Sequence, residues 1–288
     1  MKRDYNTLVL RTVGEVLRVE GCAGMTAEAL SAYARLMAAI YMEAYLSDSG
    51  LCEDSSFLKS LGGLCAELRR RVENSFSLAD RAWLAAGLHE LARTKIFPLQ
   101  DVLEQADRRL VSEVMPAEAD YHTTSVVLHV LEREPLTRCV WDDSAGGGRR
   151  YEFSIGGDYF NATLKAWAAS QRTDGSWPGV GAEEAFCRIW VIGGDFGSLP
   201  QLDNGRVCDS AYACYAQRPS ATPHALMAQY RACTARWGHT ATDRELARFV
   251  EAACLCLANQ TLSPAEHLHM QYLVFAAGSR LAEVKLPA

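Results

Sequence analysis

The stretch LKAWAASQRTDGSWP, residues 164–178, joins a helical pattern to a turn of distinctive composition. Its first half continues the three- and four-residue apolar spacing of a helix. Gly175 supplies a residue that readily adopts the left-handed conformation that ends a helix, and Asp174 can bond the backbone of the turn. Trp177 can then lie across the helix end, where Gln171 offers an amide. The stretch therefore predicts a helix closed by a turn that a tryptophan covers.

The same apolar spacing recurs along most of the 288 residues, interrupted by stretches rich in Gly, Pro, Ser and Asn. Thr26, Ser77, Thr222 and Ser263 stand where helix N-caps are expected. The pattern predicts one all-α domain, residues 1–288, with about twelve helices near 4–20, 27–46, 54–73, 78–95, 99–114, 121–133, 158–171, 182–194, 207–217, 222–237, 242–259 and 264–283.

Taken in order, these helices form six hairpins whose inner turns lie near residues 22, 75, 117, 174, 218 and 261. A repeat of helical hairpins is typical of an α-solenoid or of a closed ring of helix pairs. One interval departs from the helical pattern, because residues 138–155 read as two short strand-like runs around a glycine turn. We expect a β-hairpin insert there, between the third and fourth helix pairs.

The stretch at 164–178 resembles the Gln-Trp repeat of terpenoid cyclases and of their prenyltransferase relatives. It is also similar to a turn found in six-hairpin glycosidases. Both groups fold as α/α toroids, so the resemblance implies a toroid or a partial toroid of about six helical hairpins. In terpenoid cyclases this turn ties helices together and takes no part in the chemistry, so the resemblance supports a fold and transfers no active site.

Two signatures of those enzymes are missing from the chain. The Asp-x-Asp-Asp motif of cationic cyclases is absent, because Asp142-Asp143 is followed by Ser144 and preceded by Trp141. The Asp, Cys and His zinc ligands of protein prenyltransferases have no counterpart in matching context. Neither activity is therefore assigned directly.

Carboxylates and aromatic side chains gather around the predicted hairpin and the helix after it. This mixture suits sugar binding, in which rings stack on aromatic residues and two carboxylates serve as acid and base. Ordinary turn and N-cap aspartates would give the same pattern. The candidate catalytic residues are Asp142, Asp143 and Asp158, and the candidate ligand-binding residues are Asp120, His122, Trp141 and Tyr159. We expect the hairpin to overhang the mouth of a central cavity, with Trp141 or Asp142 facing inward.

The sequence gives no clear sign of a metal site or of a cofactor, and none is expected. His267 and His269 diverge on a helix and cannot share a metal, while Glu266 with His269 is a weak pair. The ten cysteines are scattered, mostly among Ala and Leu, and include no C-x-x-C motif. They are expected to be free thiols in a reducing compartment.

The composition of the chain makes some classes of binding partner less expected than others. With 29 basic and 35 acidic residues the net charge is -6, which disfavours nucleic acids. No apolar run is long enough to span a membrane, and a cytoplasmic location is expected. Two functions stay open: an enzyme that binds a small hydrophobic or saccharide ligand in a central cavity, and a non-catalytic helical scaffold that binds a protein or a peptide.

Overall fold

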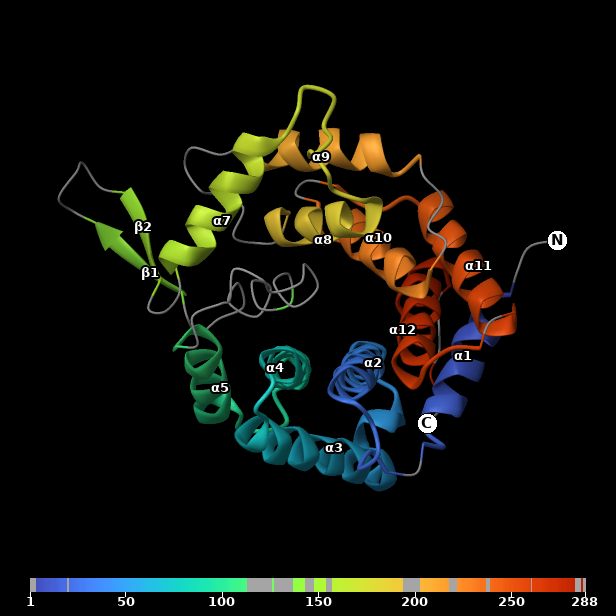
Figure 1. Ribbon diagram of the computed structural model, residues 1–288. Helices are drawn as coiled ribbons and strands as arrows, with labels where there is room; N and C mark the ends of the chain where they lie inside the picture. The colour runs from blue at the N-terminus through green and yellow to red at the C-terminus, as the bar shows by residue number, and fades with distance from the viewer. Residues whose placement is uncertain are drawn as a thin grey trace.

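The computed structural model describes the chain except for residues 1–3, 20, 113–125, 127–136, 143–147, 154–156, 194–202, 218–221, 237–238, 260, 283–285 and 287–288. This part of the chain is built almost entirely from helices, which confirms the all-α prediction (Figure 1). Its helices are α1 (Tyr5–Val16), α2 (Ala27–Leu46), the short 3-10 helix η1 (Gly50–Glu53), α3 (Ser55–Asn74), α4 (Leu78–Ala92), α5 (Gln100–Ser112), α7 (Gly157–Ser170), α8 (Ala182–Ile192), α9 (Asn204–Tyr215), α10 (Pro223–Ala235), α11 (Asp243–Asn259) and α12 (Pro264–Leu281). The helix expected near 121–133 lies almost wholly outside the described residues.

The four predicted N-caps are confirmed by their hydrogen bonds. The hydroxyl oxygens of Thr26 and Ser77 accept from backbone N–H groups three residues on, at 3.1 and 3.3 Å. Thr222 and Ser263 do the same at 3.2 Å each, and a proline follows each of them at the first helical position. These caps satisfy N–H groups that a helix start would leave unpaired, and they fix where α2, α4, α10 and α12 begin.

The helices are arranged in an inner and an outer layer. Figure 1 shows α2, α4, α8, α10 and α12 on the inner side, and α1, α3, α5, α7, α9 and α11 around them. The inner helices pack side by side in the order α4, α2, α12, α10, α8, so the first and last parts of the chain meet between α2 and α12. The last helix also packs against α1.

The buried apolar side chains form two clusters, and α12 belongs to both. Leu268 and Phe275 of α12 pack with the cluster of α1 to α5, while Met270 and Leu273 pack with that of α7 to α11. Tyr272 touches both clusters. A helix that is apolar on opposite faces is buried between two partners, so α12 is the seam that joins the two halves of the molecule.

The turn at 171–178 ties three helices together. Gln171 donates its side-chain N–H to the carbonyl oxygens of Gly175, at 3.1 Å, and of Val207 in α9, at 2.9 Å. Gly175 has a φ of +86°, and a Cβ there would lie 2.2 Å from the carbonyl oxygen of Ser210, so only glycine fits. The turn therefore brings the end of α7 directly against the backbone of α9.

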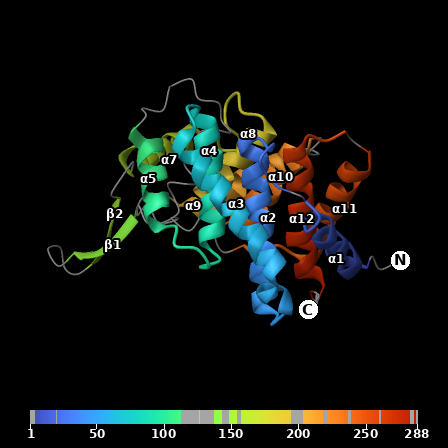
Figure 2. The same ribbon diagram turned by 90° about the horizontal axis from the view of Figure 1, so that it is seen from below.

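A two-stranded antiparallel sheet lies at the outer edge of the molecule. Strand β1 (Thr137–Asp142) pairs with β2 (Gly148–Phe153), with Thr137 opposite Phe153 and Asp142 opposite Gly148. Both views place the sheet beside α7, pointing away from the inner helices (Figures 1 and 2). The prediction that this segment overhangs the mouth of a central cavity is therefore wrong for its strands.

Among the side chains that the structure describes, nine cysteines are free, including the buried Cys65, Cys187, Cys208 and Cys233. This outcome agrees with the expectation of free thiols for those nine side chains. Within the described ranges, no helix combines the length and the apolar character needed to cross a membrane.

Candidate metal centre

The site residues expected from the sequence all have side chains outside the described part of the structure. Asp120, His122 and Asp143 lie outside the described residues. The backbones of Trp141 and Asp142 belong to β1, and those of Asp158 and Tyr159 to the start of α7, but their side chains lie outside the description. Because β1 lies at the outer edge, its backbone is far from the inner helices (Figure 1).

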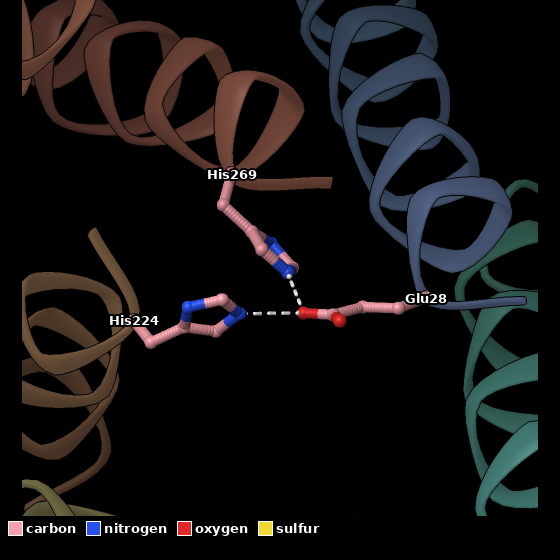
Figure 3. Close-up of side chains that lie close together, drawn as sticks. All are labelled: Glu28, His224 and His269. Carbon is pink, nitrogen blue, oxygen red and sulfur yellow. Dashed lines mark hydrogen bonds and ion pairs between the residues drawn. The ribbon is translucent and has the colours of Figure 1, made fainter. Parts of the chain in front are cut away.

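Three other side chains converge where the inner helices begin: Glu28 of α2, His224 of α10 and His269 of α12 (Figure 3). Each comes from a different inner helix, and Glu28 and His269 are 241 residues apart in the chain. One ligand atom of each lies within 4.8 Å of the others. We call these three residues the Glu-His-His cluster.

The two imidazoles meet at a single carboxylate oxygen. His224 Nε2 lies 2.9 Å from Glu28 Oε1, and His269 Nε2 lies 3.1 Å from the same atom. The imidazole rings are nearly perpendicular, at 68°, with centroids 6.0 Å apart. Two nitrogens and one oxygen thus surround one small volume.

Helix capping explains why these side chains meet. Thr26 makes Glu28 the second residue of α2, and Thr222 with Pro223 makes His224 the second residue of α10. Residues at that position project from the helix end rather than from its flank. His269 sits about one turn and a half into α12, close enough to reach the starts of α2 and α10.

The cluster is only partly open to solvent. The side chains of His224 and Glu28 are 32% and 25% exposed, whereas that of His269 is 3% exposed. Solvent therefore reaches the cluster from the side of His224 and Glu28, while His269 lies on its buried side.

Charges within the cluster are strongly coupled. Burial alone would raise the pKa of Glu28, but its hydrogen bonds to both histidines and their charges hold that pKa well below 4.5. The hydrogen bond to Glu28 raises the pKa of His224, and the carboxylates of Glu266 and Glu183 add to this. Burial lowers the pKa of His269, and the hydrogen bond to Glu28 opposes that change.

A second carboxylate stands behind His224. Glu266 Oε1 lies 3.6 Å from His224 Nδ1, the ring nitrogen that faces away from Glu28. Its other oxygen accepts from the backbone N–H of Ser263 at 2.9 Å, as part of the cap of α12. Glu266 is thus fixed by the helix start and lies within ion-pair distance of the imidazole.

The sequence predicts all three helices but not the Glu-His-His cluster. As possible metal-binding partners of His269, only its near neighbours His267 and Glu266 stand out in the sequence. One feature of the sequence could have predicted the cluster. Glu28, His224 and His269 each stand near the start of the second helix of a predicted hairpin. In a ring of hairpins those helices run parallel, so their starts meet at one face.

No protein-family model, no curated protein and no solved structure matches the chain.

Proposed function

We propose that the protein is an α/α-toroid enzyme whose reaction centre is a divalent metal ion, best fitted by Zn²⁺, held by Glu28, His224 and His269. The toroid is supported by the inner and outer layers and by the packing of α12 against α1 and α2. In this proposal six helical hairpins close into a ring, with the metal where the inner helices begin.

The observation that carries the metal is the spacing of its ligand atoms. A tetrahedral zinc site with bonds of about 2.0–2.1 Å places neighbouring ligand atoms about 3.3 Å apart. The two nitrogen-to-oxygen distances here are 2.9 and 3.1 Å, so a small outward shift makes room for the ion. Two histidines and one glutamate are also the ligand set of several catalytic zinc sites, which keep a fourth position open.

The chemistry that follows is activation of water. A zinc ion held by these residues would supply an activated water molecule at neutral pH, because an open zinc site lowers the pKa of water to about 7. Glu266 would hold His224 in the tautomer that presents Nε2 to the metal. The starts of α2, α10 and α12 direct backbone N–H groups and positive partial charge toward this face, which favours a transition state that gains negative charge. Metal-assisted hydrolysis is the reaction class that we propose.

The substrate class is the small hydrophobic or saccharide ligand expected from the sequence. Support comes from Trp83 of α4, whose ring lies 6.1 Å from that of His269. An indole beside a reaction centre offers an apolar face on which a sugar ring or a hydrocarbon can pack.

A metal-free acid and base is the second candidate function. Both imidazoles can donate their Nε2–H to Glu28, which leaves that oxygen fully satisfied without an ion. Moreover, His269 Nδ1 is buried and has no hydrogen-bond partner among the described residues, whereas metal-bound histidines usually donate from that nitrogen. If neither catalytic function holds, the remaining candidate is a non-catalytic helical scaffold that binds a protein or a peptide.

The metal is tested by substituting His269. We expect purified His269→Gln protein to contain one equivalent of zinc less than the wild type after dialysis against Zn²⁺ and removal of the excess. His267→Gln is the matched control, because His267 is exposed on the same helix two residues away. Elemental analysis measures both. Equal zinc contents in the two variants would exclude the proposed centre.

The pH dependence of stability separates the two candidates. Because the pKa of His224 is raised above its ordinary value of 6.5, its pairing with Glu28 stabilises metal-free protein fully below pH 6.5. That contribution is lost as the pH rises through the raised pKa. We therefore expect His224→Gln to destabilise chelator-treated protein more at pH 6 than at pH 9, in urea unfolding.

With Zn²⁺ present the trend should reverse, because a metal binds the neutral imidazole and its affinity grows with pH. The same variant should then cost more stability at pH 9 than at pH 6. Identical pH trends with and without Zn²⁺ would favour the acid-base candidate over the metal.

A further inference from the structure

A second group of metal-ligating side chains lies at the other end of α10. It consists of Cys233 near the end of α10, His239 in the following loop and Glu245 in the first turn of α11, and we call it the thiol cluster. Nine residues separate His224 from Cys233 along α10, so the two clusters are about 13 Å apart along that helix. They share no residue and are independent sites.

The distances within the thiol cluster are close to those of a coordination sphere. Cys233 Sγ lies 3.9 Å from His239 Nε2 and 3.8 Å from Glu245 Oε1. His239 Nε2 lies 3.6 Å from Glu245 Oε2. With Zn–S of about 2.3 Å and Zn–N of about 2.0–2.1 Å, tetrahedral geometry places sulfur and nitrogen about 3.5 Å apart. The three side chains thus need to close in by only a few tenths of an ångström.

The local sequence fixes Glu245 in place. Its Oε2 accepts from the backbone N–H and from the hydroxyl of Thr242, both at 2.8 Å, while its own N–H donates to the Thr242 hydroxyl at 3.3 Å. This reciprocal cap at the start of α11 leaves Oε1 facing the sulfur of Cys233. The carboxylate is therefore positioned by the helix start.

A nucleophilic cysteine is a poor explanation of this arrangement. Cys233 has no exposed surface, and burial raises the pKa of its thiol. The same nitrogen of His239 faces both the sulfur and the carboxylate, so the imidazole cannot take a proton from one side while the other side orients it. Three side chains that converge in this way are instead typical of residues that bind one metal ion together.

Arg236 is a cationic side chain close to Glu245, and it also forms an ion pair with a second acid, Asp209. Arg236 Nη2 lies 3.9 Å from Glu245 Oε1, but its Nη1 pairs with Asp209 at 3.3 Å. The guanidinium carbon lies 3.9 Å from the ring centroid of Tyr212, which holds the group to one side. Arg236 and Tyr212 also come within hydrogen-bonding reach of the Cys233 thiol. A metal bound by the cluster would replace these contacts of the sulfur, while Arg236 would keep its ion pair with Asp209.

We propose that Cys233, His239 and Glu245 bind a divalent metal ion that accepts a thiolate, with Zn²⁺ the best fit, and that this ion ties the end of α10 to the start of α11. Binding replaces the thiol proton with a metal–sulfur bond and releases that proton to solvent, with no change of oxidation state. The site has three protein ligands, and its fourth position takes water. Its existence does not depend on the Glu-His-His cluster.

Cobalt is the probe that isolates this site. Thiolate bound to Co²⁺ gives an intense charge-transfer band in the near ultraviolet, which histidine and carboxylate ligands do not give. We expect chelator-treated His269→Gln protein to bind one equivalent of Co²⁺ with this band, and to lose the band when Zn²⁺ displaces the cobalt. Failure of this protein to bind Co²⁺, or binding without the band, would overturn the proposal.

Two further variants in the same background assign the ligands. Cys233→Ala should abolish the band, while Cys65→Ala, which alters another buried free cysteine far from the cluster, should keep it. If Cys233→Ala does not fold, His239→Gln tests the same point, because that side chain is 25% exposed and lies in a loop. We expect at least tenfold weaker Co²⁺ binding in His239→Gln. An unchanged affinity would remove His239 from the site and contradict the proposal.

Discussion

Replacing Trp177 with alanine is expected to lower the free energy of unfolding by about 3–5 kcal/mol, the usual cost of truncating a buried aromatic side chain. The indole is 2% exposed and stacks on Tyr215 with ring centroids 6.3 Å apart. Its Nε1–H donates to the carbonyl oxygen of Trp167 at 2.7 Å, so the variant also loses a hydrogen bond between the turn and α7. The melting temperature should fall by roughly 10 °C, as measured by calorimetry.

Zinc binding distinguishes this structural role from a functional one. Trp177 lies in the turn between α7 and α8, and the Glu-His-His cluster lies on α2, α10 and α12. Folded Trp177→Ala protein at low temperature should therefore bind Zn²⁺ with the stoichiometry of the wild type. An unchanged melting temperature combined with lost zinc would reverse the assignment of this turn to structure.

Replacing Glu90 with alanine is also expected to lower the free energy of unfolding by about 3–5 kcal/mol, because the substitution leaves the buried charge of Arg35 without its partner. Arg35 and Glu90 join α2 to α4 with Nε and Oε1 3.2 Å apart, and their side chains are only 6% and 5% exposed. Tyr272 of α12 faces the same guanidinium at 5.6 Å. Without Glu90, the charge of Arg35 lacks its closest counter-charge. Urea unfolding at pH 7 measures the loss.

Two controls assign this loss to the stranded charge. Arg93 also contacts Glu90, at 3.1 Å, but its side chain is 62% exposed, so Arg93→Ala should cost less than about 1 kcal/mol. The double variant Arg35→Met with Glu90→Leu removes both charges and should recover most of the stability. A double variant as unstable as Glu90→Ala would mean that lost packing, rather than charge, explains the effect.

Much of the fold could be predicted because it depends on local signals. Apolar spacing and N-cap residues are properties of neighbouring positions, so the beginnings of α2, α4, α10 and α12 were predicted to within one residue. The turn at Gly175 is also local, since a left-handed residue and a short Asp side chain determine it. The closure of the hairpins into a ring stays a prediction.

The candidate site could not be predicted in the same way. Glu28 and His224 are ordinary residues of a helix start, and nothing beside them in the sequence marks them as partners. Their proximity comes from the order in which the inner helices pack. The expected enzyme residues around Trp141 and Asp142 were chosen because they are close in sequence, and β1 lies at the outer edge. The Glu-His-His cluster, and not that segment, therefore supports the proposed enzyme.

Because α12 joins the two halves of the molecule, the contacts between those halves can form only late in synthesis. Glu28 leaves the ribosome early, and His269 follows only after a further 241 residues. Until then α2 lacks the helix that packs against it, and the imidazole of His224 has no neighbour on α12. Nascent chains that stop before α12 must therefore keep apolar surface open to chaperones, and Glu28, His224 and His269 can meet only after α12 has been synthesised.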